Sequence, residues 1–227
     1  AAGSGKTTVA LHLAAAASAS FENSVFLLEA DLRRPTLGAL LDLPGDQGLS
    51  TLLRDGDSDR PPIQVLDLSA MSRRHPPVKV SPAAGESAAG ESAATTQVAP
   101  TTVATNGHSG NGHSTNGKLS LLLAGPRIDN AAGLLESGAV RSLIQTCRGL
   151  YELTVIDGPP PLLVADSVPL AKQVDGVIIV ARLGKDTGPR IRSLRVELER
   201  LGIEPIGVVA NFARARRNPY YSSRRRR

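Results

Sequence analysis

Short, nearly continuous apolar runs recur along the chain, as expected of strands that are buried on both faces of a parallel sheet. Between them, apolar residues fall three and four positions apart, as at Val140, Ile144 and Cys147, which predicts amphipathic helices. The predicted strands are 24–29, 63–69, 119–124, 153–157, 176–181 and 206–210. The predicted helices are 7–17, 37–41, 49–53, 140–150, a segment between Asp166 and Asp175, and 191–201. Strands that alternate with helices predict an α/β fold with a doubly wound, mostly parallel sheet.

The segment 76–117 interrupts this pattern with small and polar residues and contains a direct repeat, 83–87 followed by 88–92. Such a segment buries too little apolar area to offset its ordering entropy, so we predict a disordered insertion in a surface loop. His108 and His113 lie on this Gly- and Ser-rich tether, which makes a poor metal site. The predicted organisation is one domain formed by 1–75 and 118–213, the insertion 76–117, and a basic tail, 214–227.

The first eight residues, Ala-Ala-Gly-Ser-Gly-Lys-Thr-Thr, match a phosphate-binding P-loop that runs into a helix. Gly3 and Gly5 allow backbone N–H groups to turn toward phosphate oxygens, with Ser4 and Thr8 in the same loop. Lys6 supplies a positive charge, and Thr7 offers a hydroxyl to Mg²⁺. The alternative is a Gly-rich turn before an ordinary helix.

The full P-loop pattern begins with a glycine that would precede Ala1. We therefore expect the chain to continue upstream, with a strand that leads into the P-loop and lies in the centre of the sheet. We also expect the 227 residues to fold poorly without that strand.

Three carboxylates follow predicted strands, at the sheet edge where parallel α/β folds bind their ligands. Glu29 and Asp31 are two residues apart, so one can hold Mg²⁺ or its waters while the other takes a proton from an attacking hydroxyl. Asp157 ends an apolar strand, as the usual Mg²⁺-supporting partner of a P-loop does; the alternative is an Asp that caps a turn. Arg33 and Arg34 could meet a phosphate or a neighbouring subunit, or lie in a solvated loop.

The amino-acid composition indicates a protein with a hydrophobic core and argues against nucleic-acid binding. The 41% of hydrophobic residues suffices for a core, whereas 3% aromatic residues and no Trp argue against a stacking surface for single-stranded nucleic acid. Much of the net charge of +5 comes from arginines near the end of the chain, so we predict no specific nucleic-acid partner. The single Cys147 excludes an internal disulfide and is predicted to be buried and structural. The sequence contains no signal peptide and no apolar run of about 20 residues, so a cytoplasmic location is expected.

Together, the motifs resemble the bacterial tyrosine kinases of capsule and exopolysaccharide biosynthesis, in which they are called Walker A, A′ and B; here they are 3–7, 29–35 and 155–160. The resemblance implies ATP and Mg²⁺ as cofactors, bound by Lys6 and Thr7 with support from Asp31 and Asp157. Glu29 stands where this family usually has an aspartate, and Asn211 matches a position that contacts adenine in related ATPases.

The resemblance also implies a place and partners in the cell. The family's autophosphorylated tyrosine cluster would correspond to Tyr220 and Tyr221. A membrane-embedded polysaccharide co-polymerase, fused upstream or separate, would activate a homo-oligomeric kinase at the inner face of the plasma membrane. The kinase would then regulate the chain length or export of the polysaccharide.

Two alternatives are open from the sequence. One is a nucleotide-dependent binding switch of the export machinery with little kinase activity. The other is a partition-type ATPase, since the partition and septum-positioning ATPases share this branch of the P-loop fold. Their signature lysine would fall at Ala1, which argues against them.

Overall fold

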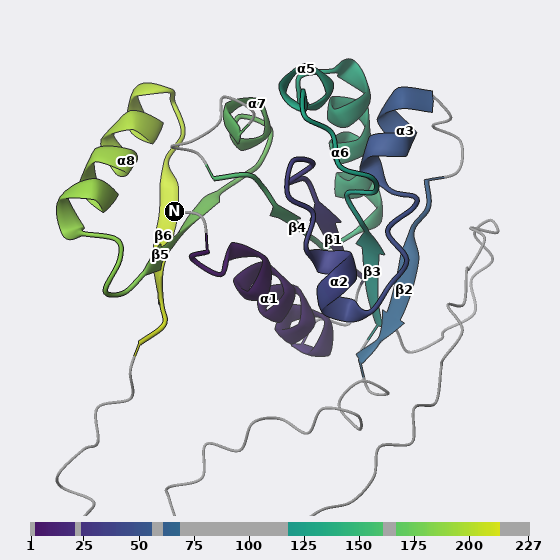
Figure 1. Ribbon diagram of the computed structural model, residues 1–227, viewed down its shortest axis with the longest axis horizontal. Coiled ribbons are helices and arrows are strands. Elements are labelled where there is room, and N and C mark those ends of the chain that lie inside the picture. The colour runs from purple at the N-terminus through teal and green to yellow at the C-terminus, as the bar shows by residue number, and fades with distance from the viewer. Residues whose placement is uncertain (1–2, 21–23, 56–60, 69–117, 161–166, 214–227) are drawn as a thin grey trace, which may run out of the picture.

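The computed structural model describes residues 3–20, 24–55, 61–68, 118–160 and 167–213 (Figure 1). Its strands are β1 (Val25–Glu29), β2 (Gln64–Asp67), β3 (Lys118–Leu122), β4 (Leu153–Asp157), β5 (Val177–Arg182) and β6 (Pro205–Asn211). Its helices are α1 (Lys6–Ser20), α2 (Leu37–Leu41), α3 (Leu49–Asp55), α5 (Ala132–Leu135), α6 (Gly138–Leu150), α7 (Ser167–Ala171) and α8 (Gly188–Arg200). The predicted insertion and tail lie outside these residues, and so do Tyr220, Tyr221, His108 and His113.

The strands form two sheets, with the orders β2-β3-β1-β4 and β5-β6. β1 runs parallel to β3 and β4, and β5 runs parallel to β6, as the apolar runs predicted. β2 is the exception, because it pairs antiparallel with β3 at the edge of the first sheet. Figure 1 shows β5 and β6 set apart from the other strands, with the start of α1 between the two groups. The expected α/β architecture is confirmed, but its sheet is divided between β4 and β5.

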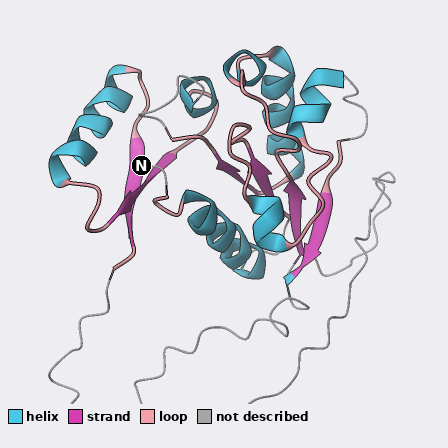
Figure 2. Cartoon of the chain, in the orientation of Figure 1, coloured by secondary structure: helices cyan, strands magenta, loops and turns pink. Residues whose placement is uncertain are grey.

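Helices cover both faces of the larger sheet (Figure 2). Every residue of β1 is buried, and alternate side chains of a strand point to opposite faces of its sheet. Both faces must therefore be covered. Val25 and Leu27 pack with the alanines of α1, which have high helix propensity and allow close approach. Phe26 and Leu28 pack on the other face with residues of α3, α5 and α6.

Cys147 of α6 belongs to this second cluster and is 3% exposed, which confirms the predicted buried thiol. A smaller cluster lies under α8 and is formed by Ile179, Leu194, Leu198 and Ile203. Among the described residues, no helix has the length and apolar character needed to cross a membrane.

Candidate functional site

The P-loop adopts the backbone that its glycines predict. Gly3 and Gly5 have φ angles of 75° and 80°, in the left-handed region where side chains with a Cβ are disfavoured. Helix α1 starts directly afterwards, at Lys6, and the Val9 N–H donates to the Gly5 carbonyl over 2.9 Å. Ser4 is fully buried, and its hydroxyl has no hydrogen-bond partner among the described residues. The helix N-terminus and the loop N–H groups therefore stand where an anion would bind.

The second sheet contributes to the P-loop from the far end of the chain. Arg182 and Asn211 are paired in register at the ends of β5 and β6. Arg182 Nη1 donates to the Gly3 carbonyl at 3.2 Å, and Asn211 Nδ2 donates to the Ser4 carbonyl at 3.0 Å. A Cβ at Gly5 would meet the Asn211 side chain, so this glycine is required for close approach as well as for its φ angle. The structure thus brings Asn211 to the P-loop, while its contact with adenine stays a prediction.

Glu29 lies at the end of β1 beside Asp157 of β4, in direct register. Its carboxylate is buried, at 1% exposure, and accepts three backbone hydrogen bonds. Oε1 accepts from the N–H groups of Thr36 and Leu37, at 2.6 and 2.7 Å, and Oε2 accepts from the Ala124 N–H at 3.1 Å. Through both of its oxygens, Glu29 thus joins the start of α2 to the segment that directly follows β3.

Asp157 is also buried, at 3% exposure, and its Oδ2 has no hydrogen-bond partner within the part of the chain that the structure describes. The pKa of Asp157 is raised to about 6, chiefly by burial and in smaller part by the charges of Glu29 and Asp31, although the Thr7 hydroxyl and the Lys6 ammonium lower it. These influences show that the P-loop side chains and all three predicted carboxylates lie around one point.

Asp31 differs from the other two carboxylates because it is partly exposed. Its Oδ1 accepts one hydrogen bond, from the Arg34 N–H at 3.1 Å. This bond holds Asp31 within the turn that leads from β1 to α2. Asp31 is therefore the predicted acidic residue with the most open access to a substrate.

Thr36 is a neighbour of the site that the sequence motifs did not reveal. Its hydroxyl lies 3.2 Å from the Thr7 hydroxyl, within hydrogen-bond distance, while its N–H donates to Glu29. The sequence feature that could have indicated Thr36 is its position directly after the Asp-Leu-Arg-Arg-Pro segment and before an apolar helix. Thr36 connects the Glu29 carboxylate to the hydroxyl that is predicted to bind metal.

The residues present fit a Mg²⁺ site completed by nucleotide. Thr7 and Asp157 offer oxygen ligands, and the unpartnered Asp157 Oδ2 is a buried acceptor that a cation would satisfy. Within the described ranges, no group of three or more His, Cys, Asp and Glu side chains could hold a metal ion by itself. This agrees with Mg²⁺ chemistry, because Mg²⁺ usually keeps several waters and takes phosphate oxygens as ligands.

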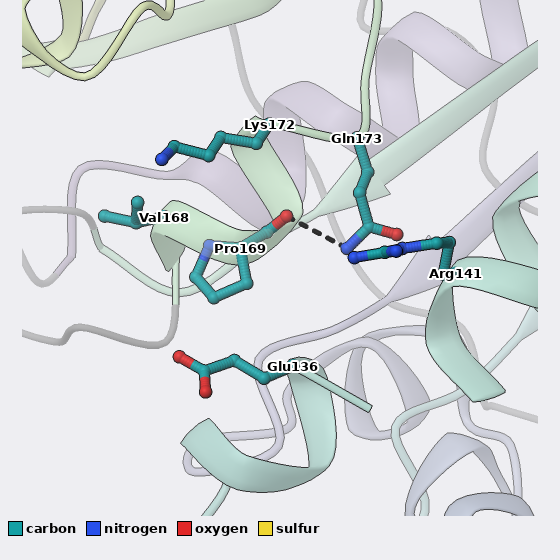
Figure 3. Close-up of a pocket in the computed structure, with 6 residues that line it drawn as sticks. All are labelled: Glu136, Arg141, Val168, Pro169, Lys172 and Gln173. Carbon is teal, nitrogen blue, oxygen red and sulfur yellow. Dashed lines mark hydrogen bonds between the residues drawn. The ribbon is translucent and has the colours of Figure 1, made fainter. Parts of the chain in front are cut away.

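Away from the P-loop, a hollow of about 640 Å³ contains none of the predicted site residues (Figure 3). It lies between helices α5 and α6 on one side and α7 on the other, and the Gln173 amide donates to the Pro169 carbonyl at 3.0 Å. Its lining residues are Glu136, Arg141, Val168, Pro169, Lys172 and Gln173. Lys172 is an exposed lysine outside the P-loop, which makes it a useful control position.

No protein-family model matches the sequence. Among curated proteins, the tyrosine-protein kinase YwqD of Bacillus subtilis is 24% identical over 219 residues, which are 96% of this chain and 72% of YwqD. The tyrosine-protein kinase Etk of Escherichia coli K12 is 29% identical over 93 residues, or 41% of this chain and 13% of Etk. Of solved structures, the VpsO kinase domain superposes with a TM-score of 0.65 at 25% identity, covering 94% of this chain and 81% of that domain.

The chain is a homologue of the bacterial tyrosine kinases. It matches only a small part of the length of Etk, and about seven tenths of YwqD. The septum site-determining protein MinD of Pyrococcus horikoshii, solved with Mg-ADP, superposes with a TM-score of 0.57 at 15% identity, over 92% of this chain and 66% of that one. At 15% identity the likeness to MinD concerns the fold alone. It therefore does not contradict the sequence similarity to the tyrosine-protein kinases.

The predicted site residues that the structure gathers are Gly3, Ser4, Gly5, Lys6, Thr7, Glu29, Asp31, Asp157 and Asn211. Thr8 lies in the first turn of α1 and is exposed. The two predicted acceptor tyrosines fall outside the described residues. Motif reasoning missed Arg182 and Thr36. It also missed Phe212, whose ring lies under the Arg182 guanidinium, 4.4 Å from the ring centre.

Proposed function

We propose that this chain is an ATP- and Mg²⁺-dependent protein-tyrosine kinase that phosphorylates tyrosines of its own tail. The observation that carries the proposal is the convergence of Lys6 and Thr7, at the start of α1, with two carboxylates: Asp31 in the turn after β1 and Asp157 at the end of the adjacent strand β4. Phosphoryl transfer needs this combination of phosphate cradle, metal ligands and proton acceptor. The homologues that carry the name tyrosine-protein kinase support it.

Each residue has a role in this proposal. The N–H groups of the P-loop and the Lys6 ammonium bind the phosphates, while Thr7 and Asp157 hold Mg²⁺. The metal ion, when bound, neutralises charge that develops on the phosphate oxygens. Asp31 accepts the proton of the tyrosine hydroxyl, since it is the accessible carboxylate. Glu29, whose oxygens already accept three N–H groups, positions the loop that carries Asp31 and Thr36.

The cellular role extends the same proposal. The kinase would regulate the chain length or export of an exopolysaccharide or capsule, with a membrane-embedded co-polymerase as its activator. It would act at the inner face of the plasma membrane as a homo-oligomer, with Tyr220 and Tyr221 as acceptors. These statements rest on the resemblance to the polysaccharide-system kinases.

Mass spectrometry for phosphotyrosine after incubation with Mg²⁺ and ATP tests the activity. We expect phosphate on Tyr220 or Tyr221 in the full chain, its loss in Lys6→Ala, and its retention in Lys172→Ala, where the lysine directly follows α7 and is exposed. Absence of phosphotyrosine in a protein that binds ATP would refute the kinase assignment. That result would favour the nucleotide-dependent switch with little kinase activity. The observation that supports this alternative is that both Glu29 oxygens already accept backbone N–H groups, which leaves Glu29 less able to take a proton.

A further inference from the structure

Thr36 stands at the N-terminus of α2, yet its hydroxyl does not cap that helix. A threonine at this position usually accepts a hydrogen bond from a backbone N–H in the first turn. The Thr36 hydroxyl makes no such bond to the residues of α2, all of which the structure describes. Glu29 takes its place, because Glu29 Oε1 accepts from the N–H groups of Thr36 and Leu37 at 2.6 and 2.7 Å. The Thr36 hydroxyl is therefore left for another partner.

That partner is the Thr7 hydroxyl at the start of α1. Thr36 Oγ1 lies 3.2 Å from Thr7 Oγ1, within hydrogen-bond distance. Two main-chain hydrogen bonds fix Thr36 there: its N–H donates to Glu29, which is 1% exposed, and its carbonyl accepts from the Leu40 N–H at 3.0 Å. The place of the Thr36 hydroxyl beside Thr7 is therefore set by the backbone of α2 and by a buried carboxylate.

The hydrogen-bonding capacity of Thr7 indicates what this contact does. A threonine hydroxyl has one proton to donate and two lone pairs that can accept. Thr7 donates its proton to the Asp157 carboxylate, which in its ionised form can only accept. The proton between the two threonines must then come from Thr36, and it occupies one lone pair of Thr7. The other lone pair of Thr7 remains for a metal ion.

We propose that Thr36 is a positioning residue that fixes the Thr7 hydroxyl for Mg²⁺. This inference rests on the proposed function, in which Thr7 and Asp157 hold the metal ion. A threonine in a helix populates two side-chain rotamers, and the hydrogen bonds to Thr36 and Asp157 favour the same one. Residues that orient a metal ligand in this way typically contribute about 10- to 100-fold to metal affinity.

Calorimetric titration of the full chain with Mg-ATP, and with ATP in the presence of EDTA, separates metal binding from nucleotide binding. Thr36→Val keeps the shape of the side chain but removes the hydroxyl. We expect its Mg-ATP affinity to fall about 10-fold or more, while its affinity for metal-free ATP changes less than about twofold. Its midpoint in urea should equal that of the wild type, because Glu29 holds the start of α2.

Two further variants make this result specific to the Thr36 hydroxyl. Thr36→Ser keeps the donor and should bind Mg-ATP within about threefold of the wild type. Thr146→Val is the matched control, since the Thr146 side chain is exposed and its hydroxyl donates to the Ser142 carbonyl at 2.9 Å within α6. This control should leave both affinities unchanged.

Equal falls in both affinities for Thr36→Val would overturn the inference, because Thr36 would then act on the nucleotide or the P-loop without the metal ion. An unchanged Mg-ATP affinity would overturn it too, and so would a lower urea midpoint, since the hydroxyl would then be a helix cap. In these cases the wild type still binds ATP more tightly with Mg²⁺, so the proposed function survives. If the wild type binds ATP equally with and without Mg²⁺, the proposed function fails and the role of Thr36 fails with it.

Discussion

Replacing Glu29 with glutamine tests whether this carboxylate is a structural acceptor or a catalytic base. Glutamine has the same shape but only one oxygen, whereas Glu29 uses both of its oxygens. If the amide oxygen keeps the bonds to Thr36 and Leu37, the amide NH₂ faces the Ala124 N–H. The variant then loses one charge-assisted bond, weakens two more, and leaves a buried donor facing another donor.

The expected cost follows from this geometry. A hydrogen bond to a charged group contributes about 1.5–3 kcal/mol, and an unsatisfied buried donor costs about 1–3 kcal/mol. Allowing for relaxation, we expect Glu29→Gln to lower the free energy of unfolding by about 2–4 kcal/mol, a large part of the 5–15 kcal/mol typical of a domain. The site is 1% exposed, so solvent cannot replace the lost partner.

Urea denaturation of the full chain, followed by linear extrapolation, measures this difference. Asp31→Asn is the matched control, because Asp31 is partly exposed and accepts from the Arg34 N–H, whereas Glu29 is buried and accepts from three N–H groups. We expect the control to change the free energy of unfolding by less than about 1 kcal/mol. In the phosphotyrosine assay, Asp31→Asn should abolish the activity that Glu29→Gln retains in its folded fraction.

The opposite pattern would refute the reasoning. If Glu29→Gln unfolds at the wild-type urea concentration but loses phosphoryl transfer, the carboxylate is catalytic and its three hydrogen bonds contribute little. If Asp31→Asn retains full activity, Asp31 is not the proton acceptor.

Three further outcomes are expected. Gly48→Ala should lower the free energy of unfolding by more than about 2 kcal/mol, because its Cβ would meet the backbone of residues 123–125. Gly45→Ala should leave the midpoint of a thermal melt unchanged, since no atom of the described residues lies within 4 Å of the added Cβ. Since burial raises the pKa of Asp157 from 3.8 to about 6, its charge destabilises the metal-free fold as pH rises through that interval. Asp157→Asn should therefore gain about 3 kcal/mol near neutral pH and nothing below about pH 4, and an equal gain at both would contradict this. Burial raises the pKa of Cys147 to about 11, so iodoacetamide at about pH 8 should label it only after unfolding; rapid labelling of the folded chain would be the contrary result.

Features that depend on residues close together in the sequence, such as strand bounds and the P-loop backbone, could be predicted from the sequence. The strand 153–157 was predicted with the bounds that the structure shows, since its apolar run is short and ends in a carboxylate. The two P-loop glycines were likewise predictable, because their φ angles depend on their own lack of a Cβ. The same reasoning found β2 but not its antiparallel pairing, which depends on a partner strand more than 50 residues away.

The sequence by itself determined the order of strands and helices, the P-loop, and the three carboxylates at strand ends. Tertiary structure decided what those side chains do, because their partners are distant: Glu29 accepts from residues 7, 8 and 95 positions away. Asn211 and Ser4 are 207 positions apart, and Arg182 and Gly3 are 179 apart, so no local periodicity brings either pair together. Their contacts arise only when β5 and β6 place their ends beside the P-loop, and the environment of Phe212 exists for the same reason.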